Sequence, residues 1–173
     1  MSRASKMRIY KTIIRPVRTY GSESWTLTKT QENALHCIER KVLRRIVGGV
    51  CEQGTWRRRT NDELSALWND VSVGTFVRIS RLRWAGHVAR MDQAEIPSKI
   101  LSENIFGDRR VGRPNLRWED CVATNARTLL GIRNWKAAAQ NREDWRSMLE
   151  QALTQQVGRR SEEHTSELQS LTN

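Results

Sequence analysis

The chain has 173 residues and a formal net charge of +11 at pH 7, a length that allows one domain with a core of its own. Leu, Ile, Val and Phe make up only about a fifth of the residues, so the seven tryptophans must supply much of the buried surface. No apolar run approaches about 18 residues and the first residues lack an apolar signal segment, so a membrane-spanning or secreted protein is not expected.

The basic residues are mostly arginine, with 24 Arg against 6 Lys. The flat guanidinium of Arg matches phosphate oxygens and stacks on bases, whereas the Lys ammonium is a point charge. This composition is typical of a nucleic-acid-binding protein, and a soluble basic protein without such a partner is the alternative. We therefore expect the RNA or DNA backbone as the partner, and no membrane.

The three cysteines, Cys37, Cys51 and Cys121, lie far apart, and none forms a Cys-X-X-Cys pair. The adjacent His36 is the only histidine close to one of them. A zinc finger or zinc knuckle needs tighter spacing, so we predict no metal site and no cofactor. An odd cysteine count without a secretory signal is typical of a reducing compartment, so we expect an intracellular protein, nuclear or cytoplasmic.

The first segment, residues 1–50, is expected to form two helices. The first covers residues 3–14 and is interrupted or kinked at Pro16. The second follows a capping box at Thr28 and stops at Gly48. Apolar residues at helical spacing mark its buried face: Leu35, Ile38, Val42, Leu43 and Ile46. Its outer face carries four cations that either bind nucleic acid or are simply solvated: Arg40, Lys41, Arg44 and Arg45.

The second segment, residues 51–106, begins with a basic loop and ends with a polar connection and a short helix starting at Pro97. The loop contains Arg57, Arg58 and Arg59, and a capping box from Thr60 then starts a short helix.

The helix over residues 78–91 has two contrasting sides. Its apolar side suits a protein core and consists of Ile79, Leu82, Ala85, Gly86 and Ala89. The other side carries Arg83, His87 and Arg90, with Trp84 at the border. Cations beside an aromatic ring suit a phosphate backbone or unpaired bases, although a core helix with solvated arginines has the same pattern. Trp84 and Trp118 are interpreted as core residues rather than base-stacking ones.

The third segment, residues 107–157, opens with a loop that holds four arginines: Arg109, Arg110, Arg113 and Arg117. Within it, Gly112-Arg113-Pro114 resembles a minor-groove hook, although contact with any phosphate backbone is the simpler interpretation. A helix is predicted over residues 115–130, then a short helix capped by Asn134 and a last helix starting at Asn141.

Residues 158–173 turn acidic and lose helical periodicity, and they resemble a translated library-adaptor sequence. We predict a disordered tail here, either such a scar or a native tail. Because no stretch alternates at period two, the predicted fold is all-α, an irregular assembly of about six to eight helices with basic loops.

Catalytic patterns are missing from the sequence. A magnesium-dependent polymerase or nuclease needs converging carboxylates, but the acidic residues are scattered and there is no Asp-Asp pair. Two acidic pairs fall in or near first turns of predicted helices, where acids favour the helix dipole: Glu119-Asp120 and Glu143-Asp144. Neither a Ser/His/Asp or Cys/His arrangement nor a phosphate-binding glycine loop is supported, so we predict no catalytic residue.

Taken together, these stretches resemble the C-terminal part of the reverse transcriptase of a non-long-terminal-repeat retrotransposon, over roughly residues 7–155. The resemblance is carried by residues 9–17 and 20–25, 39–46, 81–91, 112–114 with 117–120, and 135–146. In that family the endonuclease precedes the fingers and palm, and the thumb and a basic region follow. The resemblance implies that residues 1–50 are thumb-like and that the palm's Tyr-X-Asp-Asp metal site and the nuclease lie outside this chain.

The resemblance implies a non-catalytic role, in which the chain grips RNA or the template–primer duplex beside the palm and fingers of the parent protein. Eleven arginines are the predicted contacts: Arg44, Arg45, Arg57, Arg58, Arg59, Arg83, Arg90, Arg109, Arg110, Arg113 and Arg117. The alternative is a structural helical module or a non-functional fragment of a decayed mobile element. Glu39 and Asp120 belong to the family pattern, but their residue types alone suggest no chemistry for them.

Overall fold

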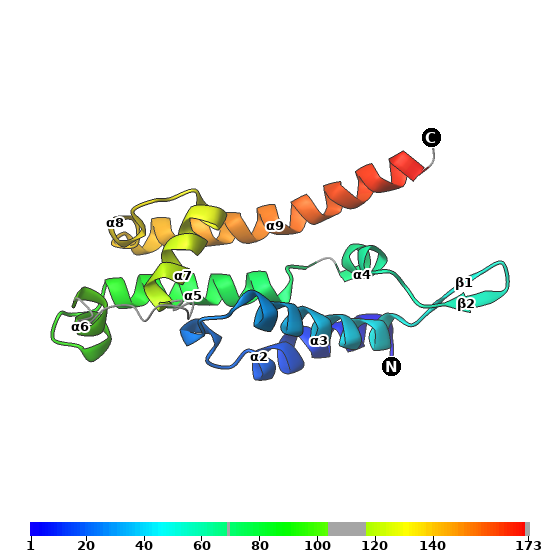
Figure 1. Ribbon diagram of the computed structural model, residues 1–173, viewed down its shortest axis with the longest axis horizontal. Coiled ribbons are helices and arrows are strands. Elements are labelled where there is room, and N and C mark those ends of the chain that lie inside the picture. Colours follow the sequence, from blue (N-terminus) through cyan, green and yellow to red (C-terminus); the bar gives the residue numbers. More distant parts are fainter. Residues whose placement is uncertain (69, 104–116, 172–173) are drawn as a thin grey trace. The chain divides into compact units, whose positions relative to one another are not determined.

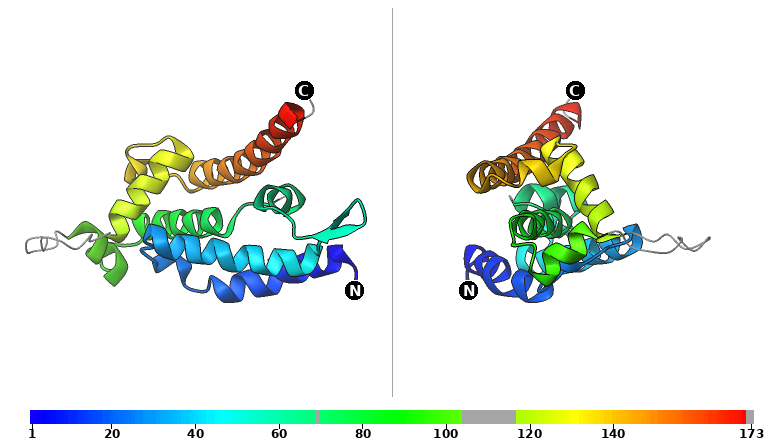
Figure 2. Two further views of the ribbon diagram at one scale, coloured as in Figure 1. Left: turned by 45° about the vertical axis from the view of Figure 1, so that its right-hand side comes forward. Right: turned by 90° about the vertical axis from the view of Figure 1, so that its left-hand side faces the viewer.

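A computed structural model describes residues 1–68, 70–103 and 117–171, with side chains described as far as Gly158 (Figures 1 and 2). The chain divides into two units. Unit 1 comprises Met1–Tyr20, Lys29–Phe76 and Leu153–Asn173, and unit 2 comprises Gly21–Thr28 and Val77–Ala152. Apart from one small hairpin, the regular elements of the described residues are helical, which confirms the predicted all-α class.

Unit 1 begins with a continuous helical run of α1 (Arg3–Ile9), a π-helical turn η1 (Tyr10–Ile14) and α2 (Arg15–Arg18). The helix is therefore longer than predicted, and Pro16 lies in the first turn of α2 instead of ending the run. Proline has no backbone N–H and its ring crowds the preceding turn, so a widened π-turn before it relieves the clash. Figure 2 shows this run lying along α3 (Lys29–Val47).

The core of unit 1 joins this run to α3 and to α4 (Asn61–Trp68). It consists of Tyr10, Leu43, Val47, Leu64 and Trp68. The rings of Tyr10 and Trp68 pack edge to face with centroids 5.2 Å apart, and the Trp68 indole N–H donates to the Val71 carbonyl at 3.1 Å. In the apolar stripe predicted for α3, Leu43 belongs to this core, Val42 and Ile46 pack against it, and Leu35 and Ile38 are half-buried.

Glu39 is a buried carboxylate in unit 1, with 5% of its surface exposed. Its two oxygens accept hydrogen bonds from the Tyr10 hydroxyl at 3.4 Å and from the backbone N–H of Val73 at 3.1 Å. Burial and the charge of Glu39 raise the pKa of Tyr10 above its ordinary value, so Tyr10 remains a hydrogen-bond donor. Glu39 therefore connects the first helix, α3 and the start of α5 (Val73–Ala89) within unit 1.

A β-hairpin interrupts the helices of unit 1, where the sequence predicted a loop and no strand. Strands β1 (Val50–Glu52) and β2 (Thr55–Arg57) pair antiparallel, with Cys51 opposite Trp56. Gln53 and Gly54 both have positive φ, 50° and 84°, as a tight two-residue hairpin turn requires. Strands of three residues are too short to show the alternation from which strands are predicted.

Unit 2 contains the 3₁₀ turn η2 (Ser22–Ser24), most of α5, α6 (Ile96–Ser102) and α7 (Trp118–Asn125). It continues through a π-turn η3 (Ala126–Leu130) and α8 (Trp135–Ala138) into α9 (Arg142–Leu171). The predicted caps of the last two helices are present, because the side chains of Asn134 and Asn141 accept backbone N–H bonds from the first turns of α8 and α9.

Helix α9 leaves unit 2 after Ala152. Its backbone continues as helix to Leu171, through most of the segment that the sequence predicted to be disordered. Among the described residues, no helix has both the length and the apolar composition that crossing a bilayer requires.

The two sides of α5 are largely as predicted. Ile79, Leu82, Ala85 and Gly86 are buried and Ala89 is half-buried, whereas Arg83 and His87 are exposed. Gly86 allows the ring of Trp145 on α9 to approach the helix, and the Trp145 indole N–H donates to the Leu82 carbonyl at 3.1 Å. The close contact between α5 and α9 in unit 2 therefore requires glycine, which has no Cβ, at position 86.

Gly86→Ala should destabilise the protein. A Cβ at this position would lie 2.3 Å from Nε1 of Trp145, whose ring is buried and cannot move aside freely. Helix propensity favours alanine by about 1 kcal/mol, but the overpacking should cost more and lower the free energy of unfolding by about 1–3 kcal/mol. Urea unfolding followed by circular dichroism measures this change. Gly158→Ala is the control, because a Cβ there meets nothing within 4 Å, and equal effects of the two substitutions would contradict the packing.

Candidate nucleic-acid interface

Eight of the eleven predicted arginines are among the described residues, and they belong to both units. Arg44, Arg45, Arg57, Arg58 and Arg59 belong to unit 1. Arg83, Arg90 and Arg117 belong to unit 2. The predicted contacts Arg109, Arg110 and Arg113 lie outside the described residues, as does the hook motif that contains Arg113.

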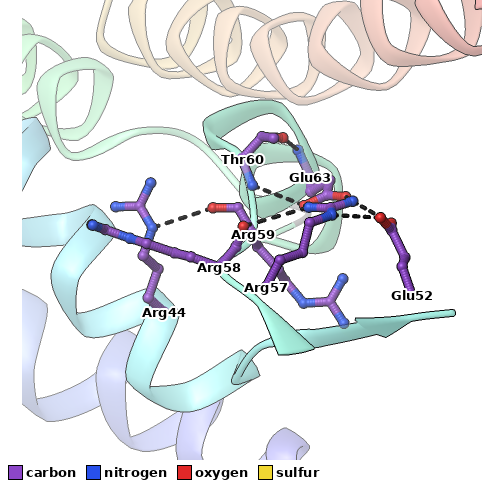
Figure 3. A network of polar contacts seen from close by, with 7 residues as sticks. All are labelled: Arg44, Glu52, Arg57, Arg58, Arg59, Thr60 and Glu63. Atoms are coloured by element: carbon purple, nitrogen blue, oxygen red, sulfur yellow. Dashed lines mark hydrogen bonds and ion pairs between the residues drawn. The ribbon is translucent and has the colours of Figure 1, made fainter. Parts of the chain in front are cut away.

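Arg57 lies between two carboxylates, as Figure 3 shows. Its Nε donates to Glu52 Oε2 at 2.7 Å, and its two Nη atoms donate to Glu63 at 2.7 and 3.1 Å. A further ion pair joins its Nη2 to Glu52 Oε1. These contacts tie the hairpin to the first turn of α4, so the structure gives Arg57 a supporting role, and phosphate contact by its side chain stays a prediction.

The capping box predicted from Thr60 is present beside Arg57 (Figure 3). The Thr60 N–H donates to Glu63 Oε2 at 2.8 Å, and the Glu63 N–H donates to Thr60 Oγ1 at 3.3 Å. The hydrogen bonds from Arg57 and then from the Thr60 backbone lower the pKa of Glu63 to about 2. Glu63 therefore serves both the helix cap and the ion pair.

Four cations on α3 and one in the loop before α4 form what we call the α3 basic face: Arg40, Lys41, Arg44, Arg45 and Arg58. Arg44 donates only to neutral acceptors, the Arg59 carbonyl at 3.5 Å and Asn61 Oδ1 at 2.7 Å. Figure 3 shows the Arg58 side chain extending toward Arg44. Burial and then the positive charges of Arg58 and Arg40 lower the pKa of Arg44. Arg40 and Arg58 therefore lie close enough to Arg44 for their charges to repel it.

No ion pair joins a described carboxylate to any member of the α3 basic face. Arg40 donates to Cys37 Sγ at 3.2 Å, whereas Lys41, Arg45 and Arg58 are exposed. Arg59 is half-buried, and its Nε has no hydrogen-bond acceptor among the described residues. The face therefore presents uncompensated positive charge to solvent, which suits an anionic partner.

The predicted arginines of unit 2 are in different environments. Arg83 is exposed, whereas Arg90 is half-buried and donates through Nη1 to the Ala139 carbonyl. Arg117 is half-buried at the cap position of α7. Arg83 and Arg90 also line a groove with Arg142 and Arg146 of α9, which were not predicted. Their common groove could not be foreseen, because it joins residues more than fifty positions apart.

The two tryptophans interpreted as core residues also differ. The Trp118 indole N–H donates to the Glu23 carbonyl at 2.7 Å and the side chain is half-buried, as expected for a packed residue. Trp84 is 36% exposed and lies beside His87, with ring centroids 5.3 Å apart. The core interpretation therefore fits Trp118 better than Trp84.

The acidic pairs lie where the sequence placed them. Glu119 and Asp120 are in the first turn of α7, and Glu143 and Asp144 are in the first turn of α9. Glu119 also pairs with Lys136 at 2.7 Å. Among the residues that the structure describes, no group of three His, Cys, Asp or Glu side chains could hold a metal ion.

Comparison with known proteins gives one informative match. The chain is 26% identical over 154 residues to an uncharacterized transposon-derived protein of Caenorhabditis elegans. The alignment covers 86% of this chain and 55% of the relative, so the chain spans about half the length of the protein it matches. This match supports a mobile-element origin. No protein-family model and no solved structure matches the chain.

The ion pair of Glu63 should depend on pH. Since the folded-state pKa of Glu63 lies below the ordinary 4.5, the interaction stabilises the hairpin above that pH and is lost as pH falls toward 2. Carbon-13 NMR of the Glu63 carboxyl should show titration near pH 2, and Arg57→Gln should move the midpoint up toward 4.5. Arg58→Gln is the control and should leave the midpoint unchanged. A midpoint unaffected by Arg57→Gln would contradict the network.

Proposed function

We propose that this chain is a non-catalytic nucleic-acid-binding segment of a retrotransposon reverse transcriptase, an RNA-directed DNA polymerase. The α3 basic face carries the proposal, because it gathers five cations with no described ion-pair partner. The similarity to a transposon-derived protein supports the mobile-element part of the proposal. The reverse-transcriptase part rests on the sequence resemblance described above.

The charge of the α3 basic face favours a polynucleotide as the ligand. Holding like charges together costs free energy, and a row of phosphates would relieve this repulsion while releasing condensed counterions. Exposed arginines contact phosphate without reading base sequence, so binding should be largely independent of sequence. The proposed role is to grip the backbone of RNA or of the template–primer duplex.

In this proposal, the palm and fingers of the parent protein carry out catalysis. These parts would supply the metal site and the nucleotide pocket, and this chain would hold the nucleic acid against them. The described acidic residues support this role, because the pairs lie in helix first turns and Glu39 is occupied by Tyr10 and Val73.

Removing three exposed cations of the α3 basic face should weaken binding. The variant Lys41→Gln, Arg45→Gln, Arg58→Gln removes side chains without described contacts, so the fold should be preserved. Filter binding to an RNA–DNA hybrid at physiological salt should show a loss of affinity of about tenfold or more.

The matched control for this variant is Arg8→Gln, Arg127→Gln, Arg133→Gln, which removes the same charge from exposed positions elsewhere. We expect it to change affinity less than about threefold, since these three arginines are not part of the α3 basic face. Equal losses in the two variants would show that only net charge matters. No binding by the wild-type chain would favour a purely structural module.

The chain alone should not incorporate dNTPs on a primed RNA template with Mg²⁺, because in the proposal the catalytic carboxylates belong to the palm. The measurement is a primer-extension assay, with an intact reverse transcriptase as the positive control. Primer extension that persists after purification under denaturing conditions and refolding would contradict the non-catalytic role.

A further inference from the structure

The groove between α5 and α9 in unit 2 has a basic rim and an apolar floor. It has a volume of about 390 Å³ and is lined by Arg83, Arg90, Arg142, Glu143, Trp145, Arg146, Leu149 and Glu150. Four arginines therefore outnumber two glutamates: Arg83 on α5, Arg90 just after the end of α5, and Arg142 and Arg146 on α9. One of these glutamates, Glu150, is paired with Arg146 along α9 at 2.9 Å.

The floor of the groove is rigid. Trp145 and Leu149 are 2% and 3% exposed, and Trp145 is fixed by its bond to the Leu82 carbonyl and by its close fit against Gly86. Arg90 is oriented by its hydrogen bond to the Ala139 carbonyl. A guanidinium has five N–H groups, so this single bond through Nη1 leaves Arg90 able to donate to a ligand as well. The groove is therefore a preformed site for an anionic group.

Trp84 and His87 are exposed residues of α5, the helix that contributes Arg83 to the groove. At 100° per residue, Arg83, His87 and Trp84 follow one another around about 100° of the surface of α5, and Arg90 directly follows the last residue of this helix, Ala89. The rings of Trp84 and His87 contact each other at a tilt of 53°, and Trp84 is 36% exposed. A partly exposed indole beside arginines provides a surface on which a base can stack.

We propose that this part of unit 2 binds single-stranded nucleic acid, with backbone phosphates in the arginine groove and an unpaired base stacked on Trp84 and His87. The inference rests on the proposed nucleic-acid-binding function and names the ligand class of a second surface. Bases in a duplex have both faces covered by their neighbours, so only a single strand can use Trp84 together with the arginines. The α3 basic face has no part in this stacking.

The experiment uses the full chain and two fluorescein-labelled probes, an oligo(U) single strand and an RNA–DNA hybrid, followed by fluorescence anisotropy. Trp84→Leu keeps an apolar side chain but removes the stacking surface, and it should weaken oligo(U) binding about tenfold while changing hybrid binding less than twofold. Trp84→Tyr, which restores an aromatic ring, should recover most of the affinity. Arg83→Gln with Arg142→Gln should also weaken oligo(U) binding.

The matched control is Trp56→Leu, because Trp56 is a 75% exposed tryptophan in the hairpin of unit 1. It should leave oligo(U) binding unchanged, and thermal unfolding should show that every variant is folded. Equal effects of Trp84→Leu and Trp56→Leu, or equal losses for oligo(U) and hybrid, would overturn the proposal. If the substitutions in the α3 basic face left hybrid binding unchanged, the proposed function of that face would be contradicted. A loss of oligo(U) binding in Trp84→Leu would still support the single-strand site in unit 2.

Discussion

Tryptophans whose indole N–H groups are hydrogen-bonded stabilise the interior of each unit. Trp68 donates to the Val71 carbonyl in unit 1, and Trp118 and Trp145 donate to the carbonyls of Glu23 and Leu82 in unit 2. A chain in which aliphatic residues are scarce must bury large aromatic side chains, and an indole can be buried at low cost only when its N–H has an acceptor. Of these three bonds, the one from Trp145 to Leu82 joins two long helices, α9 and α5.

Many of the described arginines are exposed, and their neighbours determine what they can do. Arg57 is occupied by Glu52 and Glu63 and stabilises the hairpin. Arg44, by contrast, has neutral acceptors and positive neighbours, so no described carboxylate compensates its charge. The functional interpretation thus depends on the distribution of carboxylates among the arginines more than on the net charge of the chain.

The helical pattern made much of the fold predictable, and long-range contacts explain the rest. The buried face of α5 follows from apolar residues at helical spacing, and the caps at Thr60, Asn134 and Asn141 follow from local sequence. The hairpin was missed because its strands are only three residues long. The role of Glu39 was also missed, since its partners Tyr10 and Val73 lie 29 and 34 positions away.

The candidate site shows the same limit. The positions of Arg44, Arg45 and Arg58 on an exposed basic surface were predictable, but the capture of Arg57 by two carboxylates was not. Arg142 and Arg146 share a groove with Arg83 and Arg90 only through the contact between α9 and α5, which sequence patterns do not reveal. Sequence patterns can identify an Arg-rich surface, whereas the pairing of each guanidinium is decided by tertiary contacts.

If uncompensated arginines bind a polynucleotide backbone, as we claim, binding by the wild-type chain should depend strongly on salt. The affinity for an RNA–DNA hybrid should be measured from low to physiological salt. The logarithm of the binding constant should fall linearly with the logarithm of salt concentration, with a slope of about −0.9 per phosphate contacted and at least three contacts. A flat dependence over this range would contradict the claim.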